Sequence, residues 1–466
     1  MVEFNNNNHL QSLVFEYETM SQEGTVVFNE KAVVFKLVKH YRQTKNIEEA
    51  LRVVGYGLEQ FPCTAEMYAY KASLLAEIQQ DELAIYYLDT ALLLAPNDVQ
   101  LMLIKAEILV RTEHYDEAQD LISLLKAFAP SKQMEFVLLL EAEIYENTDN
   151  YEEMFDALEA VLMINPKSEE ALSRMWLAME LSGRYEESIK LHTIITDEDP
   201  YCQLAWHNLG HAYLGMEDYE NAIDSYEFAI VCNEDFEYPY RDCAAVYLQL
   251  RDYAKAYELY KEVVDRFEAD TDVLTKIGYC QQRMEQYTSA VVHYKKALLL
   301  QYQNDEAHFR MGECLALQGN LKSAVIAFQR ALEIDDMHEE YFFALAQTYS
   351  IMGEKDLASE AFCRANEIAP ENTEYWIGHA KFYRDCESPD AALEIIEEAE
   401  MNILAVDLLY SRIICLFELG RRKEALNFLQ EALSEDFYLH KMLFDELPHL
   451  ENDREVQSLI HFCQGA

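Results

Sequence analysis

His207 and His211 stand one helical turn apart and are the pair of residues in this sequence best spaced for chemistry. Histidines at i and i+4 on one helix can share a zinc ion, but a zinc site takes at least three protein ligands. The stretch reads HNLGH and lacks the glutamate that serves as general base in the H-E-x-x-H motif. We therefore predict that no metal binds here, and metal binding stays as the weaker alternative.

The other reactive residue types give no further sign of catalysis. The 85 acidic residues include no pair whose sequence surroundings predict an apolar pocket, and the ten cysteines are scattered without a C-x-x-C pair. The chain also lacks a G-x-x-x-x-G-K-[ST] phosphate loop and a G-x-S-x-G elbow. We predict no cofactor and no enzymatic activity, and we expect the cysteines to be small buried side chains in a reducing compartment.

The histidine pair belongs to a stretch, residues 203–236, in which large and small residues recur at helical spacing. With Gln203 as position 1, these residues are Trp206 (4), Leu209 (7), Gly210 (8), Tyr213 (11), Ala222 (20), Tyr226 (24) and Ala229 (27). The spacing predicts two helices, and the small residues at positions 8 and 20 let the two backbones approach closely. One such hairpin cannot bury its own hydrophobic faces and needs neighbours of the same kind.

The same pattern recurs in register along most of the chain. Frames of 34 residues begin at 31, 65 and 99, then at 135 after a two-residue insertion near Ser131 to Met134, then at 169, 203, 237, 271, 305, 339 and 373. One residue is lost before the last frame, which begins at Val406. We count twelve repeats over residues 31–439.

Position 20 is the strongest test of the frame, because close helix packing admits little more than a methyl group there. It is occupied by Ala50, Ala84, Ala118, Met154, Ser188, Ala222, Ala256, Ala290, Ala324, Ala358, Ala392 and Ala425. Six successive repeats carry tyrosine at position 17, from Tyr115 to Tyr287, and six repeats carry proline at position 32. A proline at position 32 ends the second helix.

On these residues the chain resembles the tetratricopeptide repeat family over nearly all its length. The resemblance implies an all-α fold: an α-solenoid, a right-handed superhelix of tandem helix hairpins with helical caps at both ends. We predict a disordered tip and a capping helix over residues 1–30, one continuous twelve-repeat solenoid over 31–439, and capping helices over 440–466. Trp176, Met154 and Ser188 replace small residues, so we expect a local change of twist near repeats 4 and 5.

Family geometry places positions 2, 5, 6, 9, 12 and 13 of each first helix at or near a concave groove. In repeats 6 to 9 these positions carry basic, aromatic and amide side chains, namely His207, Asn208, His211, Tyr238, Arg241, Lys276, Tyr279, Gln282, Arg283, Phe309 and Arg310. Such a strip could bind an extended or helical peptide, with the aromatic residues as anchors. The alternative is a groove of polar residues that merely face water. No repeat has Lys at position 5 with Asn at position 9, so the sequence does not favour chaperone docking.

The formal net charge of −48 bears on the kind of partner. A surface this acidic repels nucleic acid and anionic lipid, so we expect neither as a partner, and a partner selected by charge would be basic or neutral overall. The same charge could serve only to keep a long helical protein soluble. The chain starts without a signal-like apolar segment and has no uninterrupted apolar run of transmembrane length, so we expect a cytoplasmic protein without a membrane anchor.

These observations lead to two functional hypotheses from different classes. The favoured one is a non-catalytic scaffold that binds a peptide or protein in its concave groove. The other is a structural subunit of a larger assembly that self-associates through its terminal caps, as a homodimer for example. An enzyme would require the His207/His211 pair to bind a metal.

Overall fold

The computed structural model describes residues 2–464, with side chains from residue 10 onward, and helices are the only regular elements in that range. Met1 lies outside the described residues. The chain divides into two compact units, residues 1–239 and residues 240–466. Whether the repeats form one continuous domain stays a prediction.

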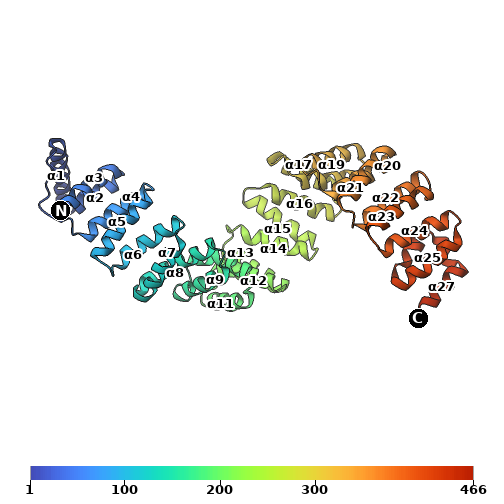
Figure 1. Ribbon diagram of the computed structural model, residues 1–466, viewed down its shortest axis with the longest axis horizontal. Helices are drawn as coiled ribbons and strands as arrows, with labels where there is room; N and C mark the ends of the chain where they lie inside the picture. Colours follow the sequence, from blue (N-terminus) through green and yellow to red (C-terminus); the bar gives the residue numbers. More distant parts are fainter. Residues whose placement is uncertain (1, 465–466) are drawn as a thin grey trace. The chain divides into compact units, whose positions relative to one another are not determined.

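The first unit begins with a helix that precedes the repeats and continues with the hairpins of repeats 1 to 6 (Figure 1). Its helices are α1 (Val2–Glu23), α2 (Lys31–Gln43), α3 (Ile47–Gln60), α4 (Ala65–Glu77), α5 (Asp81–Leu94), α6 (Val99–Arg111), α7 (Tyr115–Phe128), α8 (Ser131–Asn147), α9 (Tyr151–Ile164), α10 (Glu169–Ser182), α11 (Tyr185–Glu198), α12 (Gln203–Gly215) and α13 (Tyr219–Cys232).

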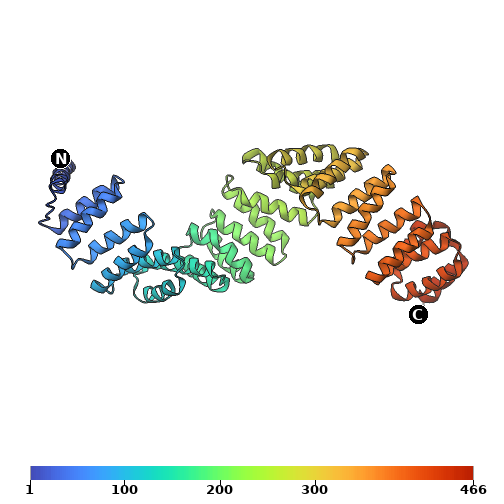
Figure 2. The ribbon, with the colours of Figure 1, turned by 45° about the horizontal axis from the view of Figure 1, so that its top comes forward.

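The second unit contains repeats 7 to 12 and the C-terminal cap. Its helices are α14 (Tyr238–Gln249), which begins at the division, α15 (Tyr253–Arg266), α16 (Thr271–Arg283), α17 (Tyr287–Leu300), α18 (Asp305–Leu317), α19 (Leu321–Ile334), α20 (Glu339–Met352), α21 (Lys355–Ile368), α22 (Thr373–Cys386), α23 (Pro389–Asn402), α24 (Val406–Glu418), α25 (Arg422–Glu435), α26 (Lys441–Glu446) and α27 (Arg454–Gln464). Figure 2 shows the orange and red helices of this unit as neighbouring hairpins.

The even-numbered helices α2 to α24 are the first helices of the twelve repeats and are called A helices; the odd-numbered helices α3 to α25 are the B helices. Within each unit, A helices of successive repeats contact one another, for example α4 with α6 in the first unit and α16 with α18 in the second. The A helices therefore share one face of each unit, called the A-helix face, and the repeat positions 2, 5, 6, 9, 12 and 13 recur along it.

The predicted repeat frame is confirmed by burial at position 20. All twelve side chains at this position, including Met154 and Ser188, are fully buried. The glycines at position 8 show how close the helices come. A Cβ atom added to Gly210 would lie 2.5 Å from the Tyr226 ring, and one added to Gly278 would lie 2.7 Å from the Tyr294 ring. The small residues thus allow an aromatic side chain of the B helix to lie against the backbone of the A helix.

The turn from the A helix to the B helix has the same backbone conformation in nearly every repeat. Position 15 has a left-handed φ in eleven repeats, at Lys45, Gln79, Glu113, Asp149, Gly183, Glu217, Arg251, Glu285, Gly319, Gly353 and Gly420. In repeat 11 the turn differs, because Glu387 has a φ of −124° and Ser388 caps a B helix that starts with Pro389. Seven side chains other than glycine adopt the left-handed conformation, so tertiary packing overrides the local preference there.

Two segments differ from the predicted boundaries. The two-residue insertion before repeat 4 is absorbed by α8, which begins at Ser131 and runs for 17 residues. The first helix begins at Val2, where the sequence predicted a disordered asparagine-rich tip. The capping role of α1 rests on Tyr17, which is buried against the first repeat and donates a hydrogen bond to Glu49 Oε1 at 2.7 Å.

Repeat 5 is the least regular repeat of the first unit. Trp176 stands at position 8, where a small residue is usual, and its side chain is 44% exposed. The A helix α10 makes few contacts with its own B helix α11, and it contacts α12 of the next repeat more extensively. The hairpin of repeat 5 is therefore less closely packed than that of repeat 6, in the region where the sequence predicted an irregularity.

Within residues 2–464, no helix combines the length and the apolar character that crossing a bilayer requires.

Ala290→Leu is a direct test of the close-contact positions. Ala290 is fully buried in α17, so extra methylene groups must displace neighbours, and we expect a loss of stability of about 1–3 kcal/mol. Glu398→Gln, on an exposed position of α23, is the control and should be near neutral. Thermal unfolding of both variants checks the ranking, and the reverse order would show that the repeat frame is wrong.

Candidate functional site

The A-helix face is the candidate binding surface, and the eleven side chains predicted to line it are distributed over both units. His207, Asn208, His211 and Tyr238 belong to the first unit, and the other seven belong to the second. The residues of the predicted strip therefore fall into two groups, one in each unit.

Three of the four residues in the first unit form an aromatic group at the end of that unit. The rings of His207 and His211 lie 4.5 Å apart between centroids, with an edge-to-face orientation, and the His207 ring also lies 6.5 Å from that of Tyr238. His207 is only 8% exposed, whereas the Tyr238 side chain is 65% exposed. Tyr238 is therefore the member of this group most available to a partner.

Asn208 does not line a groove, and here the prediction is corrected. The side chain is 2% exposed, and its amide group donates hydrogen bonds to the Leu172 carbonyl oxygen at 2.8 Å and to His192 Nε2 at 3.2 Å. Because Nε2 accepts this bond, the proton of the neutral imidazole is assigned to Nδ1, which donates to the Ser188 carbonyl oxygen at 2.8 Å. Asn208 thus ties α12 to α10 and α11.

Phe309 is the second correction. Its side chain is 1% exposed, and its ring lies 4.5 Å from that of Tyr341 and 5.7 Å from that of Phe328. The ring is therefore part of the core between repeats 9 and 10, where no partner can reach it.

Arg241 and Lys276 are partly exposed and are held by acidic neighbours. An Nη atom of Arg241 lies 2.7 Å from a carboxylate oxygen of Asp270, and Lys276 Nζ lies 2.8 Å from Asp272 Oδ2. Burial alone would raise the pKa of Asp270, but the backbone N–H of Val273 and the Arg241 guanidinium outweigh it and lower that pKa. Both cations are thus already paired within the second unit.

Four of the predicted residues come together with Tyr253 to form a group called the Tyr279 cluster: Tyr253, Tyr279, Gln282, Arg283 and Arg310. The rings of Tyr253 and Tyr279 meet edge to face at 6.1 Å. The Arg283 guanidinium lies over the Tyr253 ring at 5.3 Å, and the Arg310 guanidinium lies over the Tyr279 ring at 5.6 Å. These cation–π contacts orient both arginines on the A-helix face.

Glu313 fixes the polar side of the Tyr279 cluster. Its carboxylate accepts hydrogen bonds from Gln282 Nε2 and from Arg310 Nη1, both at 3.0 Å. Burial alone would lower the pKa of Arg310, but the charge and hydrogen bond of Glu313 outweigh it and raise that pKa. Arg283 is different, because its side chain is exposed and, among the described side chains of residues 10–464, no carboxylate lies within 4.0 Å of its guanidinium.

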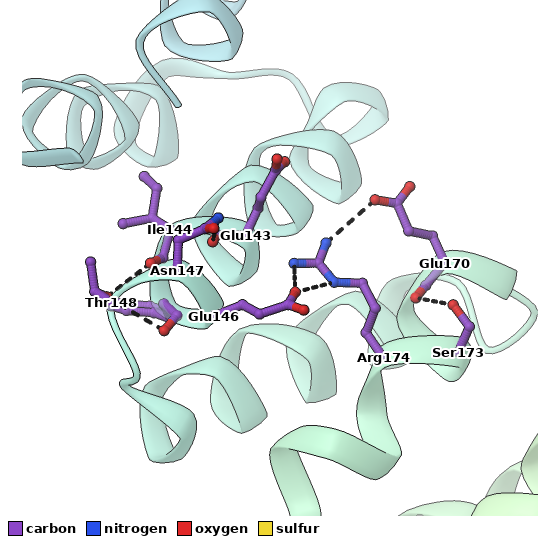
Figure 3. A network of polar contacts seen from close by, with 9 residues as sticks. Glu143, Ile144, Glu146, Asn147, Thr148, Glu170, Ser173 and Arg174 are labelled. Atoms are coloured by element: carbon purple, nitrogen blue, oxygen red, sulfur yellow. Dashed lines mark hydrogen bonds and ion pairs between the residues drawn. The ribbon is translucent and has the colours of Figure 1, made fainter. Parts of the chain in front are cut away.

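The A-helix face of repeats 4 and 5 has the opposite character, because it is acidic. Arg174 on α10 reaches Glu146 of α8 through Nε at 2.9 Å and Glu170 through Nη1 at 3.5 Å, as Figure 3 shows. Glu143 lies beside this network, and burial raises its pKa even though the charge of Arg174 opposes the change. One arginine therefore serves several carboxylates here and is not available to an anionic partner.

A cavity on the A-helix face of repeats 1 to 3 was not predicted. It has a volume of about 270 Å³ and is lined by residues of α2, α4 and α6, including Arg42, Tyr70, Ser73 and Ile104. Most of its lining residues stand at positions 2, 5, 6 and 9 of repeats 2 and 3. The sequence signal for this cavity is therefore the set of residues at the inner positions of repeats 2 and 3.

Three family models for the tetratricopeptide repeat match this chain. One matches residues 204–236, the second residues 281–348, and the third residues 137–168 and 339–372. With the twelve in-phase frames, these matches decide the family. The chain is a tetratricopeptide repeat protein. Proteins of this family generally mediate protein–protein interactions.

Among solved structures, this tetratricopeptide repeat protein is similar to YrrB, described as a TPR protein with an unusual peptide-binding site. The two are 23% identical over 41% of this chain and 97% of YrrB, with a TM-score of 0.37. One chain in the structure of the APC/C hetero-tetramer Cut9–Hcn1 is 13% identical to this protein, over 87% of this chain and 84% of that chain, with a TM-score of 0.38. MamA is 17% identical over 36% of this chain and 98% of its own, with a TM-score of 0.34. No curated protein matches the sequence.

The buried His192 predicts acid sensitivity of this tetratricopeptide repeat protein. Burial lowers the pKa of His192 to about 4, whereas an unfolded histidine titrates near 6.5. Below pH 6.5 the imidazole of the unfolded chain binds a proton, whereas the buried imidazole of the folded chain stays neutral. The contribution of His192 to the free energy of unfolding is therefore fully present above pH 6.5 and is lost as the pH falls toward 4. Between pH 7.5 and pH 5 we expect His192 to account for a loss of about 2 kcal/mol.

Urea unfolding of the wild type and of His192→Gln at both pH values measures this effect. The variant cannot gain the charge, so its unfolding midpoint should fall less between pH 7.5 and pH 5. His114→Gln, which replaces an exposed histidine of the same unit, should fall as the wild type does. If His192→Gln and the wild type lose the same stability, the buried imidazole is not the acid-sensitive group.

Proposed function

We propose that this protein is a non-catalytic scaffold that binds a peptide or protein partner on its A-helix face, with the Tyr279 cluster as the main contact surface. The observation that carries the proposal is the exposed Arg283 guanidinium over the Tyr253 ring, next to the edge-to-face pair of Tyr253 and Tyr279. Aromatic and arginine side chains are the residues that most often dominate protein–protein binding energy.

The cluster favours a ligand that combines an apolar group with an acidic side chain or a terminal carboxylate. The two tyrosine rings offer an aromatic surface, and Arg283 offers donors that no carboxylate within the described side chains, residues 10–464, occupies. The cation–π contact restricts the side chain before the ligand arrives, so less conformational entropy is lost on binding. Gln282 is held in place by Tyr294 and Glu313 and supports the same surface.

The net charge of −48 limits the partner as a whole. Long-range repulsion disfavours a strongly acidic partner, so the acidic group that contacts Arg283 belongs to a partner that is neutral or basic overall. Nucleic acid and anionic membranes are disfavoured for the same reason.

The double variant Tyr279→Ala/Arg283→Glu tests this proposal. We expect recovery of the physiological partner from native cell extract to fall at least tenfold, because both anchors of the cluster are lost. Arg364→Glu is the matched control, since it makes the same charge change on the B helix α21, where the side chain is 49% exposed. Equal recovery of every partner by the double variant and the control would refute the Tyr279 cluster as the binding surface.

Self-association through the caps is the second candidate function, and exposed aromatic side chains favour it. Phe15 in α1 is 73% exposed, and at the other end Tyr438 and Phe462 are 79% and 68% exposed. Phe462 also lines an open cavity of about 690 Å³ between α25 and α27. Single exposed apolar side chains are ordinary on a protein surface, so it is the place of Phe462 beside this cavity that favours a contact with another chain.

Light scattering at micromolar concentration separates the two candidate functions. The scaffold proposal predicts a monomer of 54.3 kDa. A dimer that dissociates in Tyr438→Ser/Phe462→Ser would favour the structural subunit instead, since these substitutions remove only exposed apolar groups. A dimer that persists in that variant would place the contact elsewhere.

A further inference from the structure

The C-terminal segment lies on the A-helix face of the last two repeats, in addition to closing the end of the array. After α25 the chain forms a short 3-10 helix, η1 (Tyr438–His440), and then α26, which contacts the A helix α24. A second 3-10 helix, η2 (Pro448–Asn452), leads to α27, which packs against the B helix α25. The two parts of the segment thus cover different surfaces.

Glu446, the last residue of α26, is held by two cations of repeat 11. Lys381 Nζ lies 2.6 Å from Glu446 Oε1, and an Nη atom of Arg384 lies 2.6 Å from Glu446 Oε2. The Arg384 side chain is only 12% exposed, so this charged contact is shielded from water. Burial alone would raise the pKa of Glu446, but the two cations outweigh it and lower that pKa.

These cations stand at inner positions of the repeat. Lys381 and Arg384 occupy positions 9 and 12 of repeat 11, the positions that Tyr279 and Gln282 occupy in repeat 8. A cap needs to cover only the outward side of the last hairpin, and that side is where α27 packs. The contact of α26 with repeat 11 therefore resembles the contact of a bound ligand more than that of a cap.

The apolar contacts of α26 are incomplete. Leu443 is fully buried and joins the core of the last repeats. A cavity of about 160 Å³ remains between α26 and the repeats, where Ile377, Ala380, Ile414 and Met442 form part of an otherwise mixed lining that includes Lys381, Arg384 and Glu446. A cavity of this volume has room for a further apolar side chain, so the segment occupies the surface without filling it.

We propose that the A-helix face of repeats 11 and 12 is a binding site for a short helical peptide that carries an apolar residue three positions before an acidic one. The helix α26 occupies this site from within the same chain until such a peptide displaces it. Leu443 and Glu446 supply the two features in the chain itself. This site is separate from the Tyr279 cluster, and neither proposal depends on the other.

The covalent link between α26 and its site determines which peptides can displace α26. A segment joined to its site by a short connection is present at a millimolar effective concentration, so it excludes weak ligands. A peptide with the same acidic group and an additional apolar group would also fill the cavity next to Met442, which gives it the higher intrinsic affinity. The two cations respond to salt, so displacement becomes easier as ionic strength rises.

The probe for this site is a fluorescein-labelled peptide with the sequence of residues 438–447, YLHKMLFDEL, blocked at both ends. Its binding to full-length protein is measured by fluorescence polarisation. Glu446→Gln removes the charge that holds α26 and leaves Lys381 and Arg384 in place, so this variant should bind the probe about tenfold more tightly than the wild type. Glu455→Gln is the matched control, because Glu455 pairs with Arg422 on the B-helix side of the same cap and its loss should not change probe binding.

Two further measurements decide whether the cations recognise the acid. The double variant Glu446→Gln/Lys381→Gln should return probe affinity to the wild-type level, and a probe with glutamine in place of its glutamate should bind Glu446→Gln about tenfold more weakly than the original probe does. Equal affinity of the wild type, Glu446→Gln and Glu455→Gln, or a double variant that keeps the tighter binding of Glu446→Gln, would overturn the proposal.

A substitution at Glu446 could disturb the cap itself. Lys381→Gln weakens the same ion pair from the repeat side, and amide hydrogen exchange measures its effect on the C-terminal segment. Lys381 is half exposed, so its replacement leaves the core intact. Exchange should become faster in residues 441–446 and stay unchanged in residues 454–464. Unchanged exchange in the first segment, or equal acceleration in both segments, would show that α26 is only part of the cap.

Discussion

The structure depends on the close approach of the two helices in each repeat, which the residues at positions 8 and 20 permit. All twelve side chains at position 20 are fully buried, and the position 8 glycines of the regular repeats leave no room for a Cβ beside the facing ring. Because this contact recurs in register, every repeat directs the same positions to the A-helix face. A partner surface on this protein is therefore assembled from side chains that are 34 residues apart in sequence and adjacent in space.

Repeat 5 shows the effect of relaxing this contact. The helices α10 and α11 make few contacts, and the hydrogen-bonded side chains of His192 and Asn208 lie where α10, α11 and α12 meet. Position 24, where His192 stands, carries a leucine, isoleucine, tyrosine or phenylalanine in most other repeats. A buried histidine must stay neutral, whereas an aromatic or aliphatic residue carries no such condition. Because burial lowers the pKa of His192, we expect the irregular packing to make the stability of the first unit depend on pH, although the hydrogen bonds are satisfied.

The sequence was sufficient for the fold, because the alanines at position 20 report a local constraint that each hairpin imposes on its own residues. It was not sufficient for the binding face. Phe309 stands at an inner position, yet Tyr341 of the next repeat covers it, and Asn208 is buried by the irregularity of the repeat before it. The contact of Glu446 with Lys381 joins residues 65 positions apart, outside any repeat period. Exposure at an inner position depends on neighbouring repeats, and a pattern within one repeat does not contain that information.

The cations of the A-helix face have a structural task that precedes any partner. With 85 acidic and 37 basic residues, acidic side chains of neighbouring A helices repel one another unless a cation stands between them. Arg174 joins α10 to a carboxylate of α8, and Arg42 pairs with Glu77 of α4. Arg384 serves Glu446 of the C-terminal segment in the same way. Several basic residues on this face thus hold successive repeats together, and others, such as Lys276, pair within their own helix. Recognition of a partner therefore rests on aromatic and apolar contacts and on the cations that are free or can be released. Arg283 is a free cation among the described side chains, and Lys381 and Arg384 become available when Glu446 is displaced.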